Sequence, residues 1–254
     1  MTEQVLVERR DNVLLITMNR PDARNAMTLA MSERIAAAVD ELDSDDTLSA
    51  AVLTGGASAF CAGMDLKGFL RGEKPSVPGR GFGGITQRPP VKPLIASVEG
   101  WALAGGFELV LACDLVVAAE TARFGLPETK RGLVAAAGGL FRLRERVPAN
   151  VALELILTGD PIDASRLHRF GLVNRLTETG AALREALELA QAIAANGPLA
   201  VAASKRVFAE APDWARDERF ERQAPITGPI SATNDAREGA AAFAEKRRPE
   251  WTRS

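Results

Sequence analysis

The sequence predicts an α/β fold in which parallel strands are joined by helical crossovers. Strand-like apolar runs recur as far as residue 176 with helical patterns between them, an alternation that favours parallel pairing. After Pro198 no strand-like run follows, and helical patterns cover residues 198–212, 214–223 and 231–247. We therefore expect a core at residues 1–195 that carries the functional site and a helical oligomerisation region at residues 196–254.

The individual elements follow from local patterns. β-rich runs on either side of the turn residues 10–12 predict an N-terminal hairpin, and apolar residues at helical spacing predict a helix over residues 27–42. Further strands are expected at 50–54, within 91–98, at 114–119 and 173–176, and further helices from 140, at 153–157, 164–170 and 181–195. Residues 71–90 hold five glycines and four prolines without periodicity, which is typical of a weakly ordered surface loop or lid.

A doubly wound nucleotide-binding sheet is the alternative within this class. The glycines of residues 79–84 resemble a dinucleotide fingerprint only loosely because no strand-like run precedes them, and no phosphate loop occurs. The sequence gives no support to that alternative.

Composition excludes several classes of function. Lys and Arg number 31 against 33 Asp and Glu, so the net charge of −2 gives no general electrostatic case for binding nucleic acid or an anionic membrane. A single histidine, His168, excludes a two-histidine metal site within one chain, and Cys61 and Cys113 have no metal or redox spacing. With no leader-like N-terminus and no apolar run of membrane-spanning length, we expect a cytoplasmic protein without a metal.

Residues 100–108 are the first candidate site. They follow a predicted strand, precede a helical run, and have small residues at 102 and 104–106 that allow close approach to the backbone. A helix that begins near Gly105 directs unpaired N–H groups at a ligand, and Glu108 lies about one turn further on. Donors for an enolate oxygen beside a carboxylate suit thioester chemistry. The alternative is a glycine turn followed by a capping glutamate.

Two other stretches could join this site. In residues 59–67, Asp65 is a candidate N-cap, and the N–H groups of Met64 and Asp65 would lie at the start of a helix. Glu128 follows Pro127 in a turn and supplies a second acid, although a plain surface glutamate is the alternative.

Four segments together resemble the signature blocks of the crotonase family, and most closely those of enoyl-CoA hydratases. They are residues 59–67, 100–108, 124–128 and 238–247, which occur in the family's order along essentially the whole chain. The resemblance implies a spiral of ββα repeats, a C-terminal helical region that forms trimers, and commonly a hexamer of two trimers.

The resemblance also implies roles for individual residues. The thioester oxygen would be held by the backbone N–H groups of Met64 and Gly105, and Glu108 and Glu128 would be the catalytic acids. Coenzyme A, which is part of the substrate and not a separate cofactor, would lie along the residues that match the family's binding positions: Arg24, Ala62, Asp65, Leu66 and Lys67, with Phe243 and Lys246 at its nucleotide end.

The presence of both acids favours hydration of a trans-2-enoyl-CoA to a 3-hydroxyacyl-CoA. We assign Glu108 as the base that activates water and Glu128 as the acid that protonates the α-carbon. Two neighbouring carboxyl groups in a partly apolar pocket should raise the pKa of one of them. Met64, where an alanine is more usual, and residues 135–136 and 140–141, which depart from the hydratase pattern, should reshape the acyl pocket.

Two alternatives remain open. One is another reaction on a CoA thioester, such as dehydration of a hydroxyacyl-CoA or carnitinyl-CoA, or isomerisation of the double bond. The other is RNA binding, as in some crotonase relatives, through the basic clusters at residues 130–131, 142–146 and 246–248. A solvated face or contacts with the CoA phosphates explain those clusters more simply, so we expect an acyl-CoA and further copies of the chain as partners, and no nucleic acid.

Overall fold

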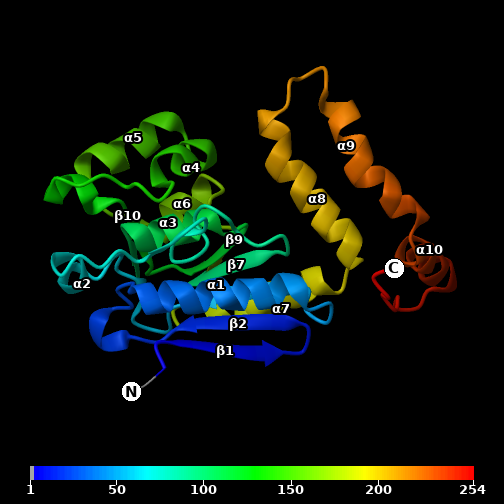
Figure 1. The fold of residues 1–254 in the computed structure, drawn as a ribbon, viewed down its shortest axis with the longest axis horizontal. Helices are drawn as coiled ribbons and strands as arrows, with labels where there is room; N and C mark the ends of the chain where they lie inside the picture. Colours follow the sequence, from blue (N-terminus) through cyan, green and yellow to red (C-terminus); the bar gives the residue numbers. More distant parts are fainter. Residues whose placement is uncertain (1–2) are drawn as a thin grey trace.

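A six-stranded sheet forms the centre of the computed structural model, which describes residues 3–254 (Figure 1). Its strands run in the order β1-β2-β3-β7-β9-β12, and all neighbours are parallel except the β1–β2 hairpin. The bounds are β1 Val5–Arg10, β2 Val13–Met18, β3 Ala50–Thr54, β7 Leu94–Val98, β9 Leu115–Ala119 and β12 Arg175–Thr177. The predicted hairpin and the predicted parallel pairing are confirmed.

A second sheet, in the order β11-β10-β8-β4, was not predicted as such. Its strands are only two or three residues long: β4 Ala59–Cys61, β8 Trp101–Leu103, β10 Arg123–Gly125 and β11 Ile162–Asp163. The expectation that residues 123–128 are a simple turn is therefore wrong, because the first three of them pair in parallel with β8. Runs this short show no periodicity, and their pairing comes from the tertiary structure.

Helices cover the main sheet and connect its strands. The bounds are α1 Leu29–Ser44, α2 Leu66–Leu70, α3 Gly105–Ala112, α4 Gly139–Arg146, α5 Ala149–Thr158, α6 Ala164–Arg169 and α7 Ala182–Ala194. In α7, alanines recur every fourth residue at 182, 186, 190 and 194 and are all buried against residues of β2, β3, β7 and β9. Small side chains on one helical face let the helix lie close to the sheet.

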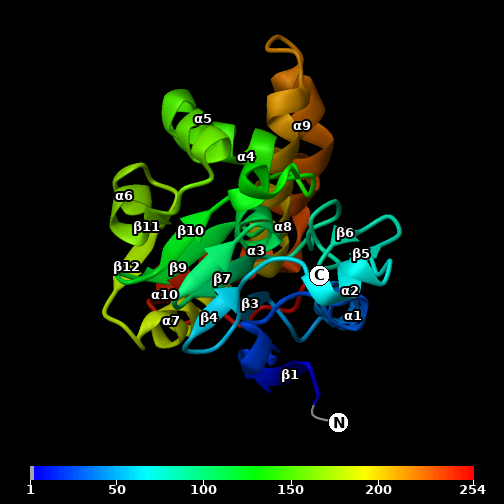
Figure 2. The same cartoon turned by 90° about the vertical axis from the view of Figure 1, so that its left-hand side faces the viewer.

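Residues 71–90 are only partly the expected surface loop, since residues 71–72, 78–79 and 87–89 are exposed, whereas residues 81–86 are packed against the core. They contain the two-stranded pair β5 (Ser76–Val77) and β6 (Gly81–Phe82), and residues 81–86 are buried. The five glycines are used for close packing and turns: a Cβ at Gly84, for example, would lie 2.4 Å from the Ser32 carbonyl oxygen of α1. Figure 2 shows this pair beside α1 and α2.

The C-terminal helices form an arm that extends away from the sheets (Figures 1 and 2). They are α8 Pro198–Glu210, α9 Arg219–Thr227 and α10 Asn234–Glu245. Lys205 attaches α8 to the core, since its Nζ donates to the carbonyl oxygens of Pro90 and Lys92 and to Asp114 Oδ2 at 2.6–2.9 Å. Within residues 3–254 no single helix meets the length and apolarity needed to cross a bilayer, although α7 and the helix at 198–213 pass that test together as a bent pair.

Candidate active site

A cavity of about 340 Å³ lies beside the second sheet, bordered by residues of β8, α3 and the β5–β6 pair. It brings together residues of four stretches that are far apart in the sequence. Its lining includes Ala62, Met64, Leu66, Phe82, Thr86, Leu103, Gly105, Glu108, Glu128, Arg131, Val134 and Ala137. Both predicted acids and both predicted amide donors therefore border one space.

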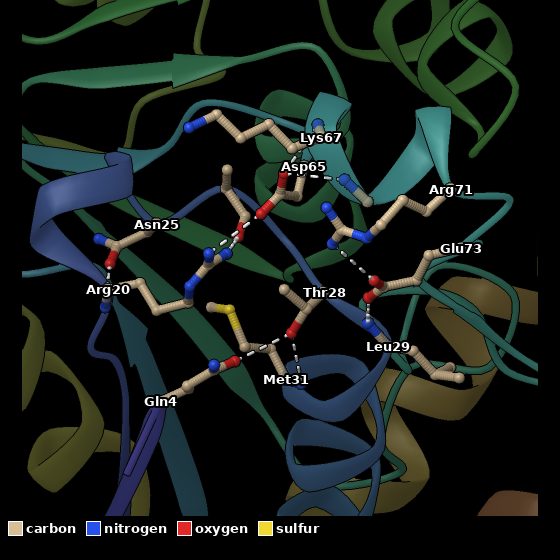
Figure 3. A network of polar contacts seen from close by, with 12 residues as sticks. Gln4, Arg20, Asn25, Thr28, Leu29, Met31, Asp65, Lys67, Arg71 and Glu73 are labelled. Atoms are coloured by element: carbon tan, nitrogen blue, oxygen red, sulfur yellow. Dashed lines mark hydrogen bonds and ion pairs between the residues drawn. The ribbon is translucent and has the colours of Figure 1, made fainter. Parts of the chain in front are cut away.

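The loop that carries Met64 is fixed by polar contacts from the segment at residues 20–27, of which Figure 3 draws those of Arg20 with Asn25 and Asp65. Asn25 is fully buried, and its Nδ2 donates to the carbonyl oxygens of Gly55, Ala59 and Phe60. Met27 N donates to Gly63 O at 2.8 Å, and Asp65 N donates to Met27 O at 3.0 Å, so Met64 is held between two backbone hydrogen bonds. These contacts set the direction of the Met64 peptide.

Gly105 is the first residue of α3 and follows Ala104, whose φ of 52° is unusual for a residue with a side chain. A Cβ at Gly63 would lie 3.4 Å from Gly105 N, and a Cβ at Gly106 would lie 2.1 Å from Cys61 O. The two loops thus approach each other at van der Waals distance. Neither Met64 N nor Gly105 N donates a hydrogen bond to another group in residues 3–254.

Glu108 is buried and directed by backbone amides. Its Oε1 accepts hydrogen bonds from Ala137 N at 2.7 Å and Gly139 N at 2.9 Å. Burial raises the pKa of Glu108, while the two amides and the Arg142 charge oppose that rise. Arg142 in turn donates to the carbonyl oxygens of Thr86 and Ala137, so it holds the loop whose amides hold the carboxylate.

Glu128 lies in the 3-10 helix η2 (Pro127–Arg131), which lines the cavity together with the start of α3. Burial raises the pKa of Glu128 to about 7, and the Glu108 carboxylate adds to the rise, whereas a bond from its own backbone amide and the Arg131 charge oppose it. Its Oε2 is buried without a hydrogen-bond partner among the described residues. The two acids therefore differ: two amide hydrogen bonds favour the anion of Glu108, whereas Glu128, with its Oε2 unpaired among the described residues, has its pKa raised to about 7.

A model of the enoyl-CoA hydratase/isomerase family matches residues 8–254. The chain belongs to the enoyl-CoA hydratase/isomerase family. It is 42% identical to enoyl-CoA hydratase EchA19 of Mycobacterium tuberculosis, over 97% of this chain and 95% of that protein. It is 39% identical to a carnitinyl-CoA dehydratase of Salmonella typhi, over 99% of each. The crystal structure of enoyl-CoA hydratase EchA1 from Mycobacterium marinum superposes with a TM-score of 0.97 at 58% identity, covering 99% of both chains.

The family match and the superposition confirm the crotonase fold that the sequence predicts, here with two sheets and C-terminal helices. In this enoyl-CoA hydratase/isomerase family member, only some of the residues expected along CoA line the cavity. Ala62 and Leu66 line the cavity, while Arg24 and Lys67 are exposed nearby. The Asp65 carboxylate instead caps α2 through Lys67 N and Gly68 N and pairs with Arg20 at 3.0 Å. Phe243 and Lys246 lie in the arm, far from α2 (Figure 1).

Several cavity residues were not predicted. Phe82 and Thr86 come from the segment that the sequence presented as a loose lid, and Arg131 borders Glu128. Among the expected departures, Met64 and Ala136 do line the cavity, whereas Leu140 and Phe141 are exposed outside it. No group of three or more His, Cys, Asp or Glu side chains in the described part of the chain could hold a metal ion.

Proposed function

We propose that this protein hydrates a trans-2-enoyl-CoA to the 3-hydroxyacyl-CoA. The observation that carries the proposal is a pair of carboxyl groups with different protonation preferences on one cavity, beside two backbone N–H groups that have no other acceptor among residues 3–254. Addition of water to an unsaturated thioester needs a base, an acid and donors for the enolate oxygen.

Each group has a role in the proposed reaction. The Glu108 carboxylate takes a proton from water as the water oxygen bonds to the β-carbon. The electron pair of the Cα–Cβ double bond forms a double bond between the α-carbon and the thioester carbon, and the carbonyl π pair moves onto the thioester oxygen, where Met64 N–H and Gly105 N–H stabilise the negative charge. The protonated Glu128 then delivers its proton to the α-carbon, which restores the carbonyl group. A Glu128 with a pKa of about 7 holds that proton in a substantial fraction of molecules at neutral pH.

Figure 1 shows α10, which carries Phe243 and ends just before Lys246, far from α2, whose Leu66 lines the cavity. The CoA roles of these two residues therefore require a neighbouring copy of the chain. We therefore propose a trimer or hexamer in which the C-terminal arm of one subunit approaches the site of another. We also propose, from the sequence, that the protein is cytoplasmic.

Dehydration is the second candidate. The same acids can run the reverse reaction, because Glu128 would remove the α-proton and Glu108 would protonate the leaving hydroxyl. The similarity to a carnitinyl-CoA dehydratase at 39% identity favours testing it.

The deciding experiment measures crotonyl-CoA hydration by wild type, Glu108→Gln and Glu128→Gln. Each variant should lose about 10²–10⁴-fold in kcat, the usual contribution of a positioned acid or base, with much less change in KM. Asp160→Asn, which removes an exposed carboxylate that does not line the cavity, serves as the control. Robust hydration by either glutamine variant would refute the two-acid mechanism, and faster turnover of 3-hydroxyacyl-CoA or carnitinyl-CoA would favour dehydration.

A further inference from the structure

The basic cluster at residues 142–146 is divided between the surface and the interior. Of its three arginines, all on α4, Arg144 is exposed, whereas Arg142 and Arg146 are half-buried. Arg146 Nη2 donates to Cys113 O at 2.9 Å, at the C-terminal end of α3. Neither half-buried arginine lines the cavity. A solvated face or a contact with CoA phosphates therefore does not account for these two side chains.

Arg142 joins two segments that are far apart in the sequence. Its Nη2 donates to Thr86 O at 2.6 Å, and its Nη1 makes a longer, weaker contact with Ala137 O at 3.4 Å. Thr86 ends the buried stretch 81–86, and Ala137 lies in the loop before α4. The planar fork of a guanidinium holds two acceptors in a fixed geometry, which an ammonium group does not. Arg142 thus fixes the loop at 137–139 relative to residues 81–86.

Each of these segments supports one of the groups assigned to the reaction. In the loop, Ala137 N and Gly139 N donate to Glu108 Oε1 at 2.7 and 2.9 Å. In the other segment Phe82 packs on Gly105, because a Cβ there would lie 2.4 Å from the end of the Phe82 ring. A single guanidinium therefore links the loop that directs the proposed base to the segment that packs on the proposed oxyanion amide.

The arrangement leaves one oxygen of the base available to water. Glu108 Oε2 accepts no hydrogen bond in residues 3–254, and unlike Glu128 Oε2 it is not fully enclosed by the protein. No ion pair joins Arg142 to Glu108 in the described part of the chain, so the cation acts through the loop and by its charge at a distance. A direct ion pair would occupy an oxygen that can take a proton from water.

The charged and titratable groups near Arg142 are few. They are Arg146 and Glu145 on its own helix, Glu108 on α3, and Cys113, whose pKa burial raises to about 12, so that its thiol stays neutral near pH 7. Burial raises the pKa of Glu108, while the two loop amides and the Arg142 charge lower it. Loss of Arg142 removes the charge and frees the loop that carries the amides. Both effects favour the protonated form of Glu108.

We propose that Arg142 is a positioning residue for the hydration reaction: by holding the loop at 137–139 to residues 81–86, it fixes the direction of the Glu108 carboxylate relative to the Gly105 amide. The inference rests on the proposed hydratase function and deepens it. Arg142 does not line the cavity, so it acts through the groups that it holds and takes no part in the proton transfers.

The test measures crotonyl-CoA hydration by Arg142→Gln and Arg142→Lys across pH. Arg142→Gln should lower kcat about 10–100-fold with little change in KM, as expected for a misplaced base. The acidic limb of its kcat/KM profile should move to higher pH, and the alkaline limb assigned to Glu128 should stay in place. Arg142→Lys retains the charge without the fork, so it should return the acidic limb toward the wild-type position but recover kcat only in part.

Arg146→Gln is the matched control, because it removes the same charge from the same helix together with a hydrogen bond to a carbonyl oxygen of the α3 end. It should leave kcat and both limbs unchanged, and urea unfolding of each variant measures the loss of stability separately. Equal effects of Arg142→Gln and Arg146→Gln on kcat and on the limbs would overturn the inference.

Two further outcomes count against the role of Arg142. A rise in KM for crotonyl-CoA with unchanged kcat and limbs would mean that Arg142 contacts CoA, and it would also overturn the inference. If Arg142→Gln does not fold, Arg142→Lys carries the test, since wild-type kcat in that variant contradicts a need for the fork. Failure of the wild type to hydrate crotonyl-CoA and longer trans-2-enoyl-CoA thioesters refutes the proposed function itself.

Discussion

At the scale of single residues, the environment of Glu128 predicts a pH profile. If Glu128 is the acid in hydration, kcat/KM should fall on the alkaline side with an apparent pKa near 7, where this side chain loses its proton in the free enzyme. The acidic side should fall where Glu108 becomes protonated. The measurement is the initial rate of crotonyl-CoA hydration from about pH 5 to pH 9 at low substrate.

Arg131 allows the assignment of the alkaline side to be tested. The Arg131 charge lowers the pKa of Glu128, so Arg131→Gln should raise that pKa and keep the acid protonated to higher pH. The alkaline limb of the kcat/KM profile should then move to higher pH. The expected movement is roughly 0.2–0.7 pH unit, since an exposed charge pair is worth about 0.2–1 kcal/mol and one pKa unit corresponds to about 1.4 kcal/mol. Arg144→Gln, which removes an exposed charge on α4, should not move the limb. A downward shift in Arg131→Gln would contradict the assignment.

The predictability of the site from sequence differs from residue to residue. Glu108 follows a glycine-rich helix start, so its approach to the N–H donors could be inferred from spacing alone. Glu128 could be identified only through the family resemblance, because its burial depends on packing between η2 and the rest of the cavity wall.

At the scale of elements, the absence of a side chain at Gly106 lets β4 of the second sheet lie against α3. A Cβ at Gly106 would lie 2.1 Å from Cys61 O, a backbone atom that cannot move without displacing β4. Gly106→Ala should therefore destabilise the fold by about 1–3 kcal/mol, and displacing the oxyanion amides by 1 Å should lower kcat about 100-fold.

Urea unfolding and crotonyl-CoA turnover measure these two effects. Gly197→Ala is the matched control, because this glycine has φ and ψ of −58° and 113°, which a residue with a side chain adopts readily before proline, and an added Cβ would lie no closer than 3.7 Å to another group. It should leave activity unchanged and stability equal or slightly higher. If Gly106→Ala matched Gly197→Ala in both measurements, close approach at Gly106 would not be what positions the site.

Element types were predictable where a run was long enough to show its period. The helix expected over residues 27–42 is observed as α1 at Leu29–Ser44, and the strand at 50–54 is observed at those residues. The β5–β6 pair could not be predicted in this way, because its glycines indicate turns in the sequence. The packing of these glycines against Ser32, Ala36 and Leu109 arises only in the folded chain. A sequence rich in glycine and proline can thus be either loose or closely packed.

At the scale of the whole molecule, the C-terminal arm leaves large apolar side chains in solvent. Phe208, Phe220 and Phe243, one on each of its helices, are 84%, 82% and 88% exposed. Exposed aromatic side chains gathered on one extension are typical of an interface, which agrees with the predicted oligomerisation region. Figure 1 shows the arm at one side of the chain and α2, whose Leu66 lines the cavity, at the other, so an assembly can bring the arm of one copy to the cavity of another.

This arrangement predicts that assembly and CoA affinity change together. Phe220→Asp should lower the mass seen by sedimentation velocity from that of a trimer or hexamer, whereas Leu157→Asp, on an exposed position of α5, should not. If Phe243 and Lys246 of a neighbouring copy hold the nucleotide end, dissociation should raise KM for crotonyl-CoA. It should leave KM for the crotonate thioester of N-acetylcysteamine, which has no nucleotide, nearly unchanged. An equal rise in KM for both thioesters would mean that the arm supports the acyl pocket and not the nucleotide, and an unchanged mass would place the interface elsewhere.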